Sequence, residues 1–245
     1  MRQQRVYTSQ PLTPGESVQL EADSSHHLSK VLRLQTGDAI ILFNGDGHEY
    51  TASIEICARQ SVQVLVQKQL NVSRESPLQI TLAQGISRGS RMDYTLQKAV
   101  ELGINTIIPL WTTRTQVKLD AKRMHKRVKH WQGVIQSASE QSGRLQLPEL
   151  LPALSLQEWV TNTSDNHEMK LLLHPEAGSS LNTLHKPEGK IALLIGPEGG
   201  ITEEEIQLCK DHCFTDIRLG PRILRTETAA LATLSAIQAL WGDFS

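Results

Sequence analysis

Polar and apolar residues alternate over much of the first seventy positions. At 49–54 and 61–66 every second side chain is apolar, which is typical of strands with one buried face. Asn-Gly-Asp-Gly at 44–47 has the composition of a hairpin turn. The strands expected here are 5–7, 17–20, 38–43, 49–54 and 61–66, with one helix at about 24–32. Many short, evenly spaced strands favour a small β-barrel.

The pattern changes after a polar stretch at 71–77 that lacks periodicity. We therefore place a domain boundary there and predict domains at 1–72 and 73–245. In the second domain the expected strands are 78–83, 104–110, 170–173, 190–195 and 216–219. The expected helices are 92–102, 120–140, one that begins after Thr202, and 227–240. Strands that alternate with helices predict an α/β domain with a mostly parallel sheet.

Two loops near the C-terminus combine glycine with proline. Gly-Pro-Glu-Gly-Gly at 196–200 follows an apolar strand, and Leu-Gly-Pro-Arg at 219–222 follows the next one. Glycine permits close backbone approach and proline fixes the chain direction. Two such loops at the ends of neighbouring strands predict a backbone-lined pocket for a flat, polar ligand. The simpler alternative is that these glycines only make turns between strand and helix.

The net charge of −1 does not suggest a nucleic-acid partner, but the distribution of charge does. Between 114 and 144 the chain has eight lysines and arginines against two carboxylates, a local balance of +6. The eight are Arg114, Lys118, Lys122, Arg123, Lys126, Arg127, Lys129 and Arg144. Such a cluster suits a phosphate backbone. A solvated basic helix face is the alternative.

Several classes of protein are not expected. Apolar runs are too short for the roughly 18 residues of a membrane span, and no secretory signal is expected at the N-terminus. The three cysteines are an odd number, which argues against a disulfide framework. Cys209 and Cys213 have no second pair of metal-ligand type, so we interpret them as small apolar residues on a helix. A cytoplasmic protein without a metal site is the expectation.

Further segments match one known family in order along the chain. They are His-Leu-Ser-Lys-Val-Leu-Arg at 27–33, Lys-Ala-Val-Glu-Leu-Gly at 98–103, Arg-Thr-Gln at 114–116 and Ala-Ser-Glu-Gln-Ser-Gly-Arg at 138–144. Together with the two glycine-proline loops, they make the chain resemble the RsmE family of SPOUT RNA methyltransferases over nearly its whole length. Several elements in the same order are a far more specific signal than one glycine-rich loop.

The resemblance implies a fold, a reaction and partners. The fold is an α/β SPOUT domain with a C-terminal trefoil knot, preceded by a PUA-like or OB-like β-barrel. The reaction is methylation of N3 of a uridine in 16S ribosomal RNA, with S-adenosylmethionine as the cofactor. The partners are 16S ribosomal RNA or the small ribosomal subunit, and a second copy of the chain in a homodimer.

The resemblance and the predicted pocket also imply roles for particular residues. The cofactor-binding set is Leu172, Leu173, His174, Gly196, Pro197, Gly199, Gly200, Ile201, Leu219, Gly220, Ile223, Leu224 and Thr228. The catalytic candidates are Glu198 and Arg225. The RNA-binding set is Arg5, Arg33, Arg114, Lys122, Arg123, Lys126, Arg144 and Arg222.

Alternatives stay open at this point. A related SPOUT enzyme would methylate a ribose 2′-hydroxyl of tRNA or rRNA from the same cofactor pocket. A non-catalytic RNA-binding or ribosome-assembly factor would bind RNA without the cofactor. Glu198 is otherwise an ordinary loop carboxylate. Glu227, in the first turn of the last helix, suits helix capping as well as function.

Overall fold

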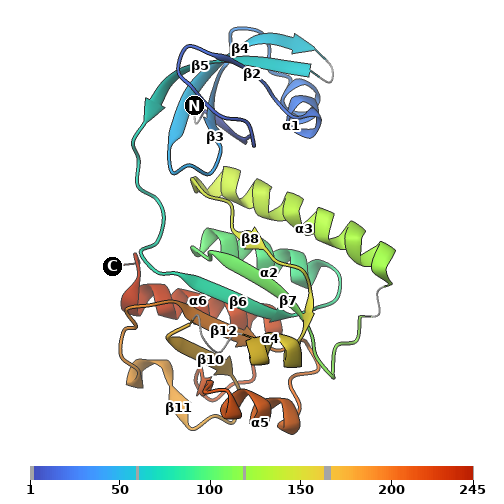
Figure 1. The fold of residues 1–245 in the computed structure, drawn as a ribbon, viewed down its shortest axis with the longest axis vertical. Helices are drawn as coiled ribbons and strands as arrows, with labels where there is room; N and C mark the ends of the chain where they lie inside the picture. Colours follow the sequence, from blue (N-terminus) through green and yellow to red (C-terminus); the bar gives the residue numbers. More distant parts are fainter. Residues whose placement is uncertain (1–2, 59–60, 118–119, 163–166, 245) are drawn as a thin grey trace. The chain divides into compact units, whose positions relative to one another are not determined.

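The computed structural model describes residues 3–58, 61–117, 120–162 and 167–244. It divides into two compact units, shown in Figure 1. Unit 1 comprises Met1–Glu75 and Ser139–Leu147, and unit 2 comprises Ser76–Ala138 and Pro148–Ser245. The predicted domain limits, 1–72 and 73–245, stay a prediction. The short segment Ser139–Leu147 belongs to unit 1 because Arg144 in it is held by Glu75 and Arg5.

Unit 1 is built on a single five-stranded sheet. Its elements are β1 (Gln4–Tyr7), β2 (Ser17–Gln19), α1 (Ala22–His26), the π-helical turn η1 (His27–Val31), β3 (Ala39–Phe43), β4 (Glu49–Ala58) and β5 (Ser61–Leu70). The strand order is β1-β3-β4-β5-β2, in which only the β1–β3 pair is parallel. Every strand predicted in this region is present, and the 44–47 turn joins β3 to β4 with Gly45 and Gly47 at positive φ.

The alternating pattern explains the core of unit 1. Ile40 and Leu42 of β3, Ile54 of β4 and Val64 of β5 are all fully buried in one apolar cluster. The predicted helix at 24–32 forms as α1 followed by η1, and Leu28 of η1 packs into the same cluster. One face of the sheet is therefore covered, as period-2 alternation requires.

A set of buried and partly buried ion pairs also holds unit 1 together, and we call it the unit 1 ion cluster. It consists of Arg5, Glu49, Arg74, Glu75 and Arg144. Glu49 pairs with both Arg5 and Arg74, and the Arg144 guanidinium donates to Glu75 Oε2 from Nε at 2.9 Å. Arg5 Nη2 also donates to the Arg144 carbonyl at 2.7 Å. These contacts attach the segment Ser139–Leu147 to β1 and to the chain after β5.

Unit 2 is an α/β domain with a parallel sheet. Its helices are α2 (Ser90–Glu101), α3 (Ala121–Ser142), α4 (Leu156–Asn162), the 3₁₀ turn η2 (Leu181–Thr183), α5 (Glu203–Asp211) and α6 (Thr226–Trp241), of which α3 ends in unit 1. Its strands are β6 (Ile80–Gly85), β7 (Thr106–Trp111), β8 (Glu149–Leu150), β9 (Leu154–Ser155), β10 (Met169–Leu173), β11 (Ser179–Ser180), β12 (Ile191–Ile195) and β13 (Thr215–Arg218). The strand order is β11-β13-β10-β12-β6-β7-β8, with β9 beside β7. All pairs recorded in this sheet are parallel, which bears out the mostly parallel sheet.

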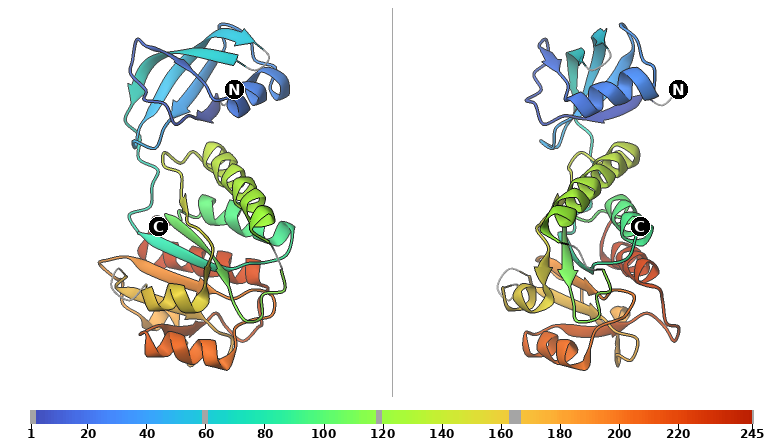
Figure 2. Two further views of the ribbon diagram at one scale, coloured as in Figure 1. Left: turned by 45° about the vertical axis from the view of Figure 1, so that its right-hand side comes forward. Right: turned by 90° about the vertical axis from the view of Figure 1, so that its right-hand side faces the viewer.

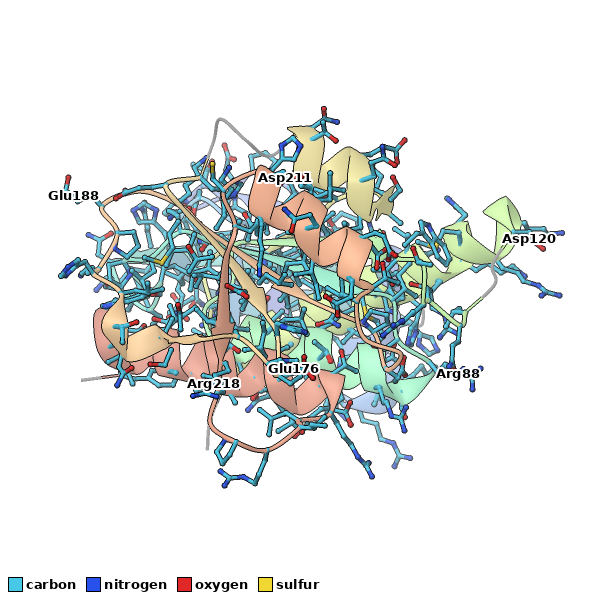
Figure 3. All side chains as sticks on the ribbon, turned by 90° about the horizontal axis from the view of Figure 1, so that it is seen from below. Arg88, Asp120, Glu176, Glu188, Asp211 and Arg218 are labelled. Atoms are coloured by element: carbon cyan, nitrogen blue, oxygen red, sulfur yellow. The ribbon has the colours of Figure 1, made fainter. Side chains whose placement is uncertain are left out.

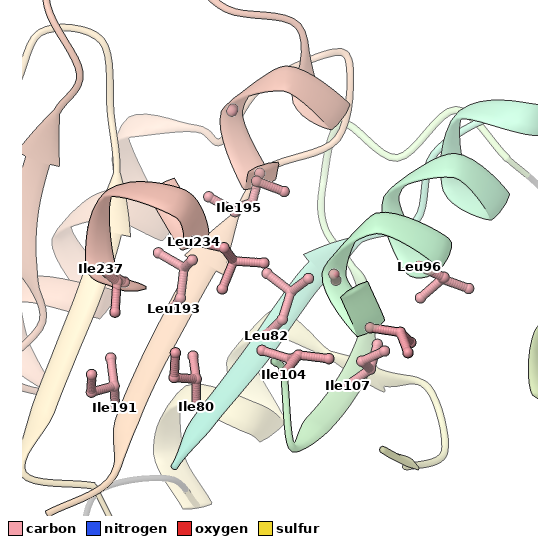
Figure 4. Close-up of a cluster of buried hydrophobic side chains, with 14 of the residues drawn as sticks. Ile80, Leu82, Leu96, Ile104, Ile107, Ile191, Leu193, Ile195, Leu234 and Ile237 are labelled. Carbon is pink, nitrogen blue, oxygen red and sulfur yellow. The ribbon is translucent and has the colours of Figure 1, made fainter. Parts of the chain in front are cut away.

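Helices cover both faces of this sheet, as the two views of Figure 2 show. Leu193 of β12 and Leu82 of β6 face α2 and α6, and they pack with Leu234 in the cluster of Figure 4. Leu194 of β12, on the opposite face, packs with residues of α4 and α5 such as Trp159. Strands buried on both sides read as continuous apolar runs rather than alternating ones, which is why 191–195 is wholly apolar.

Local sequence signals set several ends of these elements. Thr202 caps α5, and its side chain and that of Glu205 complete the predicted capping box. Gly103, just past the end of α2, has φ of +82°, the left-handed geometry that favours glycine. The short elements α4, β8, β9 and β11 carry weaker signals and were not predicted. Charged side chains such as Arg88, Asp120 and Glu188 are exposed at the periphery in Figure 3.

Candidate active site

A cavity of about 440 Å³ opens in unit 2 where β10, β12 and β13 end. These strands are neighbours in the sheet, and loops that follow parallel strands meet at the same edge. Eleven of the thirteen residues predicted to bind a cofactor line this cavity. The predicted catalytic residues Glu198 and Arg225 line it too, and so does Arg222. Their roles in binding and catalysis stay predictions.

The two exceptions among the predicted cofactor residues are Gly199 and Thr228. A Cβ at Gly199 would lie 2.9 Å from both Cβ and the carbonyl oxygen of Arg114, so glycine is required there for close packing. Arg114 Nη1 in turn donates to the Gly199 carbonyl at 3.2 Å. Arg114 therefore supports the 196–200 loop from outside. Thr228 lines a second, neighbouring cavity.

One hydroxyl group fixes the 196–200 loop against the sheet. Thr226 Oγ1 donates to the Gly196 carbonyl at 2.6 Å and accepts from Nε2 of the buried Gln84 at 2.9 Å. At the end of β6, a Cβ on Gly85 would lie 2.4 Å from the Pro197 backbone nitrogen. The loop thus rests directly on the backbone of β6, which fixes this part of the cavity wall.

Three charged residues at the cavity form what we call the cavity ion cluster: Arg91, Glu198 and Glu227. Glu198 Oε1 accepts from the Arg88 backbone N–H at 2.9 Å and from Arg91 Nη1 at 3.1 Å. Burial raises the pKa of Glu198, but these hydrogen bonds and the Arg91 charge outweigh it, so the pKa lies below its ordinary value. Arg91 Nε lies 4.0 Å from Glu227 Oε1. Glu227 Oε2 is buried and has no hydrogen-bond partner in the described part of the chain.

The remaining residues predicted to bind RNA fall into two groups. Lys122, Arg123 and Lys126 are exposed on α3, and Arg33 is exposed on unit 1, where it lines a hollow together with Lys30. Arg33 also has φ of +56°, a strained conformation of the kind found at functional sites. These residues are open to a partner. Lys118 of the basic cluster lies outside the described residues.

Arg5 and Arg144 require a correction. Both side chains are only 6% exposed and belong to the unit 1 ion cluster. A buried guanidinium that is held by carboxylates presents no surface to a phosphate. The structure therefore assigns both arginines to the fold of unit 1 rather than to RNA binding.

The cysteines are only partly as expected. Cys209 is buried on α5, where burial, and to a lesser degree Glu205, raises the pKa of its thiol to about 12. Cys213 instead follows the end of α5 and is exposed at φ of +63°. Among the described residues, no three His, Cys, Asp or Glu side chains are grouped so as to hold a metal ion. The helices that the structure describes are each too short or too polar to cross a membrane.

Six residues that line the cavity were not in the predicted set: Arg91, Pro175, Ile195, Thr226, Glu227 and Ala229. Five of them adjoin predicted residues in the sequence, so extending each loop by a residue or two includes them. Arg91 carries no such signal. It lies on α2, after β6, and reaches the cavity only because β6 is next to β12 in the sheet.

The cavity has the properties of a binding site for a polar ligand of moderate size. Its volume lies within the range of small-molecule pockets, about 300–1,000 Å³. Leucine and isoleucine side chains supply apolar walls, glycine loops expose backbone donors and acceptors, and charged groups lie at the cavity ion cluster. S-adenosylmethionine fits this description, because it combines a flat adenine with a sugar, a sulfonium and an amino acid.

Comparisons with known proteins identify the family of the chain. Residues 74–238 match the model of an RNA methyltransferase domain, and residues 20–67 match an RNA methyltransferase PUA domain. A candidate methyltransferase from Legionella pneumophila, solved with bound SAM, is 43% identical over the whole of both chains with a TM-score of 0.96. A ribosomal RNA small subunit methyltransferase E from Neisseria gonorrhoeae, bound to S-adenosyl methionine, is 39% identical over the whole of both chains with a TM-score of 0.92.

A curated relative extends the agreement to the sequence level. The ribosomal RNA small subunit methyltransferase E of Buchnera aphidicola (subspecies Schizaphis graminum) is 34% identical, and the alignment covers 98% of each protein. Matches of this length include both the PUA domain and the parallel-sheet domain. The chain therefore belongs to the RNA methyltransferase family whose curated members are named ribosomal RNA small subunit methyltransferase E.

Proposed function

We propose that this protein transfers a methyl group from S-adenosylmethionine to N3 of a uridine in 16S ribosomal RNA of the small subunit. The observation that carries the proposal is the cavity bounded by the three loops after β10, β12 and β13. Two relatives of the same fold hold S-adenosylmethionine, and the curated relatives are named for small-subunit ribosomal RNA. The choice of uridine N3 rests on the resemblance to the RsmE family.

In this proposal different cavity residues contact different parts of the cofactor. Backbone groups of Gly196, Gly200 and Gly220 line the cavity and would hold the adenine and ribose. The side chains of Ile201 and Leu224 would supply apolar contact for the adenine. The exposed Arg222 and Arg225 are suited to hold a carboxylate or an RNA phosphate, because a guanidinium pairs with either in a bidentate manner.

The protein contributes mainly position and proton handling. When bound, S-adenosylmethionine supplies an activated methyl group on a sulfonium. The pre-formed loops hold the donor site rigid, so an acceptor that docks beside them meets it in line. Uridine N3 carries a proton that must leave as the new bond forms. The carboxylates of the cavity ion cluster line the cavity, and their negative charge suits them to accept or relay that proton.

The exposed basic residues form the RNA contact. Lys122, Arg123 and Lys126 lie on one helix, and Arg33 with Lys30 lies on unit 1. Basic side chains on two units suit a folded RNA that is recognised through its phosphates and shape. The substrate is then the assembled small subunit in preference to naked RNA.

The finer features of the fold belong to the same proposal. Unit 1 closes into a PUA-like barrel, supported by register shifts in the β4–β5 pair, which bend strands as closure requires. The chain after β13 is threaded into a trefoil knot, supported by the return of Thr226 to the Gly196 carbonyl of the preceding loop. The protein forms a homodimer through the outer side of α6, where Leu240 is 49% exposed, and it works in the cytoplasm.

The test uses purified protein, S-adenosylmethionine and small ribosomal subunits from cells that lack this methyltransferase. We expect mass spectrometry of digested 16S rRNA to show one new 3-methyluridine, and calorimetry to show cofactor binding at micromolar levels. Leu219→Trp, which fills the cavity, should abolish both, whereas Ile56→Trp on the exposed face of β4 should abolish neither. A 2′-O-methylated nucleoside, or RNA binding without cofactor binding, would contradict the proposal and favour one of the two alternatives.

A further inference from the structure

Glu227 lies on the wall between two cavities of unit 2. The second cavity has a volume of about 1170 Å³ and is formed by α2, α3 and the start of α6. Arg91, Arg225 and Glu227 line both cavities. A ligand in the first cavity and a ligand in the second would therefore meet at these three side chains.

The second cavity has the chemistry of a single-stranded RNA groove. Lys126 and Lys129 of α3 supply positive charge for phosphates. Tyr94 of α2 is 47% exposed and offers a ring on which a base can stack. His130 is held by Asp93 at 2.9 Å. An RNA strand in this groove would present one base to the three shared side chains, beside the first cavity.

The two glutamates of the cavity ion cluster differ in how well they are satisfied. Glu198 Oε1 already accepts two hydrogen bonds, from Arg88 and Arg91, and these hold the carboxylate in its ionised form. Glu227 Oε2 is buried and accepts none from the described residues. A buried acceptor without a donor costs free energy, so it indicates a partner that arrives with a ligand.

We propose that Glu227 is the catalytic base, and that its Oε2 accepts the proton from N3 of the target uracil. This inference rests on the proposed function. The N3–H bond breaks and the proton moves to Glu227. The nitrogen electron pair forms the N3–CH₃ bond, and the S–CH₃ bond breaks with its pair kept on sulfur, so the sulfonium becomes a neutral thioether. Glu198 is a positioning residue that acts through Arg91.

The pH dependence of this step is set by every charged group around Glu227. From the elements that line the two cavities these are Arg91, Asp93 and Tyr94 on α2, Lys126, Lys129 and His130 on α3, His174 after β10, Glu198 after β12, and Arg222 and Arg225 before α6. Most of the charged ones are cations. They stabilise negative charge that develops on the uracil oxygens.

The experiment compares wild type with Glu227→Gln, Glu227→Asp, Glu198→Gln and Glu203→Gln. Glu203 is an exposed first-turn carboxylate of α5 and serves as the matched control for loss of a helix N-terminal charge. Single-turnover methylation of small subunits is measured from mildly acidic to alkaline pH. Cofactor affinity is measured by calorimetry, RNA affinity by filter binding, and stability by urea unfolding.

We expect Glu227→Gln to slow methyl transfer about 100-fold or more, because a positioned base contributes roughly 10²–10⁴-fold. Its rate should rise in proportion to hydroxide, since N3 must then lose its proton to solvent. Glu227→Asp should keep the wild-type pH profile at an intermediate rate. Cofactor affinity, RNA affinity and unfolding free energy should match those of Glu203→Gln. Glu198→Gln should be slower than wild type without acquiring the hydroxide dependence.

A substrate whose N3–H is more acidic should rescue the activity of Glu227→Gln. Subunits that contain 5-fluorouridine have a more acidic N3–H, so they should restore much of the rate to Glu227→Gln and little to Glu198→Gln. A Glu227→Gln protein with the wild-type rate, or one that loses stability or cofactor affinity and keeps the wild-type pH profile, would assign Glu227 a structural role and overturn the inference. Failure of the proposed function is distinguishable, because the wild type itself would then make no 3-methyluridine.

Discussion

The unit 1 ion cluster and the cavity ion cluster are made of the same residue types, arginine and glutamate, but their carboxylates accept hydrogen bonds to different degrees. In unit 1 each carboxylate is shared between guanidinium or backbone donors, and Arg5 and Arg144 are almost wholly buried. At the cavity, Arg91 is 43% exposed and one glutamate oxygen has no donor among the described residues. A carboxylate that is supplied with donors by the protein holds a fold together, whereas a buried carboxylate oxygen without a donor has capacity for a ligand.

The most disruptive test of this comparison removes Arg144. Arg144→Ala leaves Glu75 without its main ion-pair partner, so we expect a loss of about 3–5 kcal/mol in unfolding free energy. Urea denaturation measures it. Arg123→Ala, at a position on α3 that is 72% exposed, is the control and should change stability by less than about 1 kcal/mol. Equal effects of the two variants would show that burial does not distinguish these arginines.

Removing Arg91 breaks the cavity ion cluster, and we expect it to affect methyl transfer rather than stability. Its ion pairs are partly exposed, so Arg91→Ala should cost only about 0–1 kcal/mol of stability. Glu198 and Glu227 then lose their shared cation, and we expect methyl transfer to fall about tenfold to a hundredfold. Arg91→Lys should recover part of the rate. A destabilisation as large as that of Arg144→Ala would mean that the cavity ion cluster also holds the fold.

A capping residue outside both clusters sets the scale for an ordinary local contact. Thr202→Ala removes the acceptor for the Glu205 backbone N–H at the start of α5, and we expect a loss of about 1 kcal/mol. The measurement is again urea unfolding. Thr202→Ser, which keeps the oxygen, should lose much less. If both variants lose the same amount, packing of the methyl group rather than capping is responsible.

The smallest expected effect is a pH dependence of the unfolding free energy that arises from Glu198. Because its pKa in the folded protein lies below the ordinary 4.5, folding favours the ionised form. The stabilisation is present above the pKa of the unfolded chain and is lost as pH falls through the folded pKa. The difference in unfolding free energy between wild type and Glu198→Gln should therefore be largest near neutral pH and shrink in acid. A difference that grows in acid would contradict the assignment.

Local signals made most of the fold and much of the cavity predictable. The apolar run at 191–195 and the glycine-proline loop after it are contiguous, so the sequence alone indicates a strand that ends at a binding loop. The same holds for Thr202 and Glu205, three residues apart. In each case the residues that must cooperate are neighbours in the chain.

What escaped prediction depends on pairs that are distant in the chain. Arg91 meets Glu198 across 107 positions, and the Arg144 guanidinium meets the carboxylate of Glu75 across 69. Charge patterning identifies basic residues but cannot say which of them find a buried carboxylate. Arg5 and Arg144 were therefore grouped with the RNA contacts, and Arg91 was left out of the site.

The position of β12 in the sheet has a consequence for synthesis on the ribosome. β6 pairs with β7 on one edge, but its other edge waits for β12, which is translated more than one hundred residues later. Until then a strand whose residues are all buried in the finished protein has an unpaired edge, the kind of surface that invites aggregation. Even after β12 is inserted, the Thr226 hydroxyl that fixes its loop has yet to emerge. The cavity after β10, β12 and β13 is thus among the last parts to be completed, and one edge of β6 stays unpaired until β12 arrives.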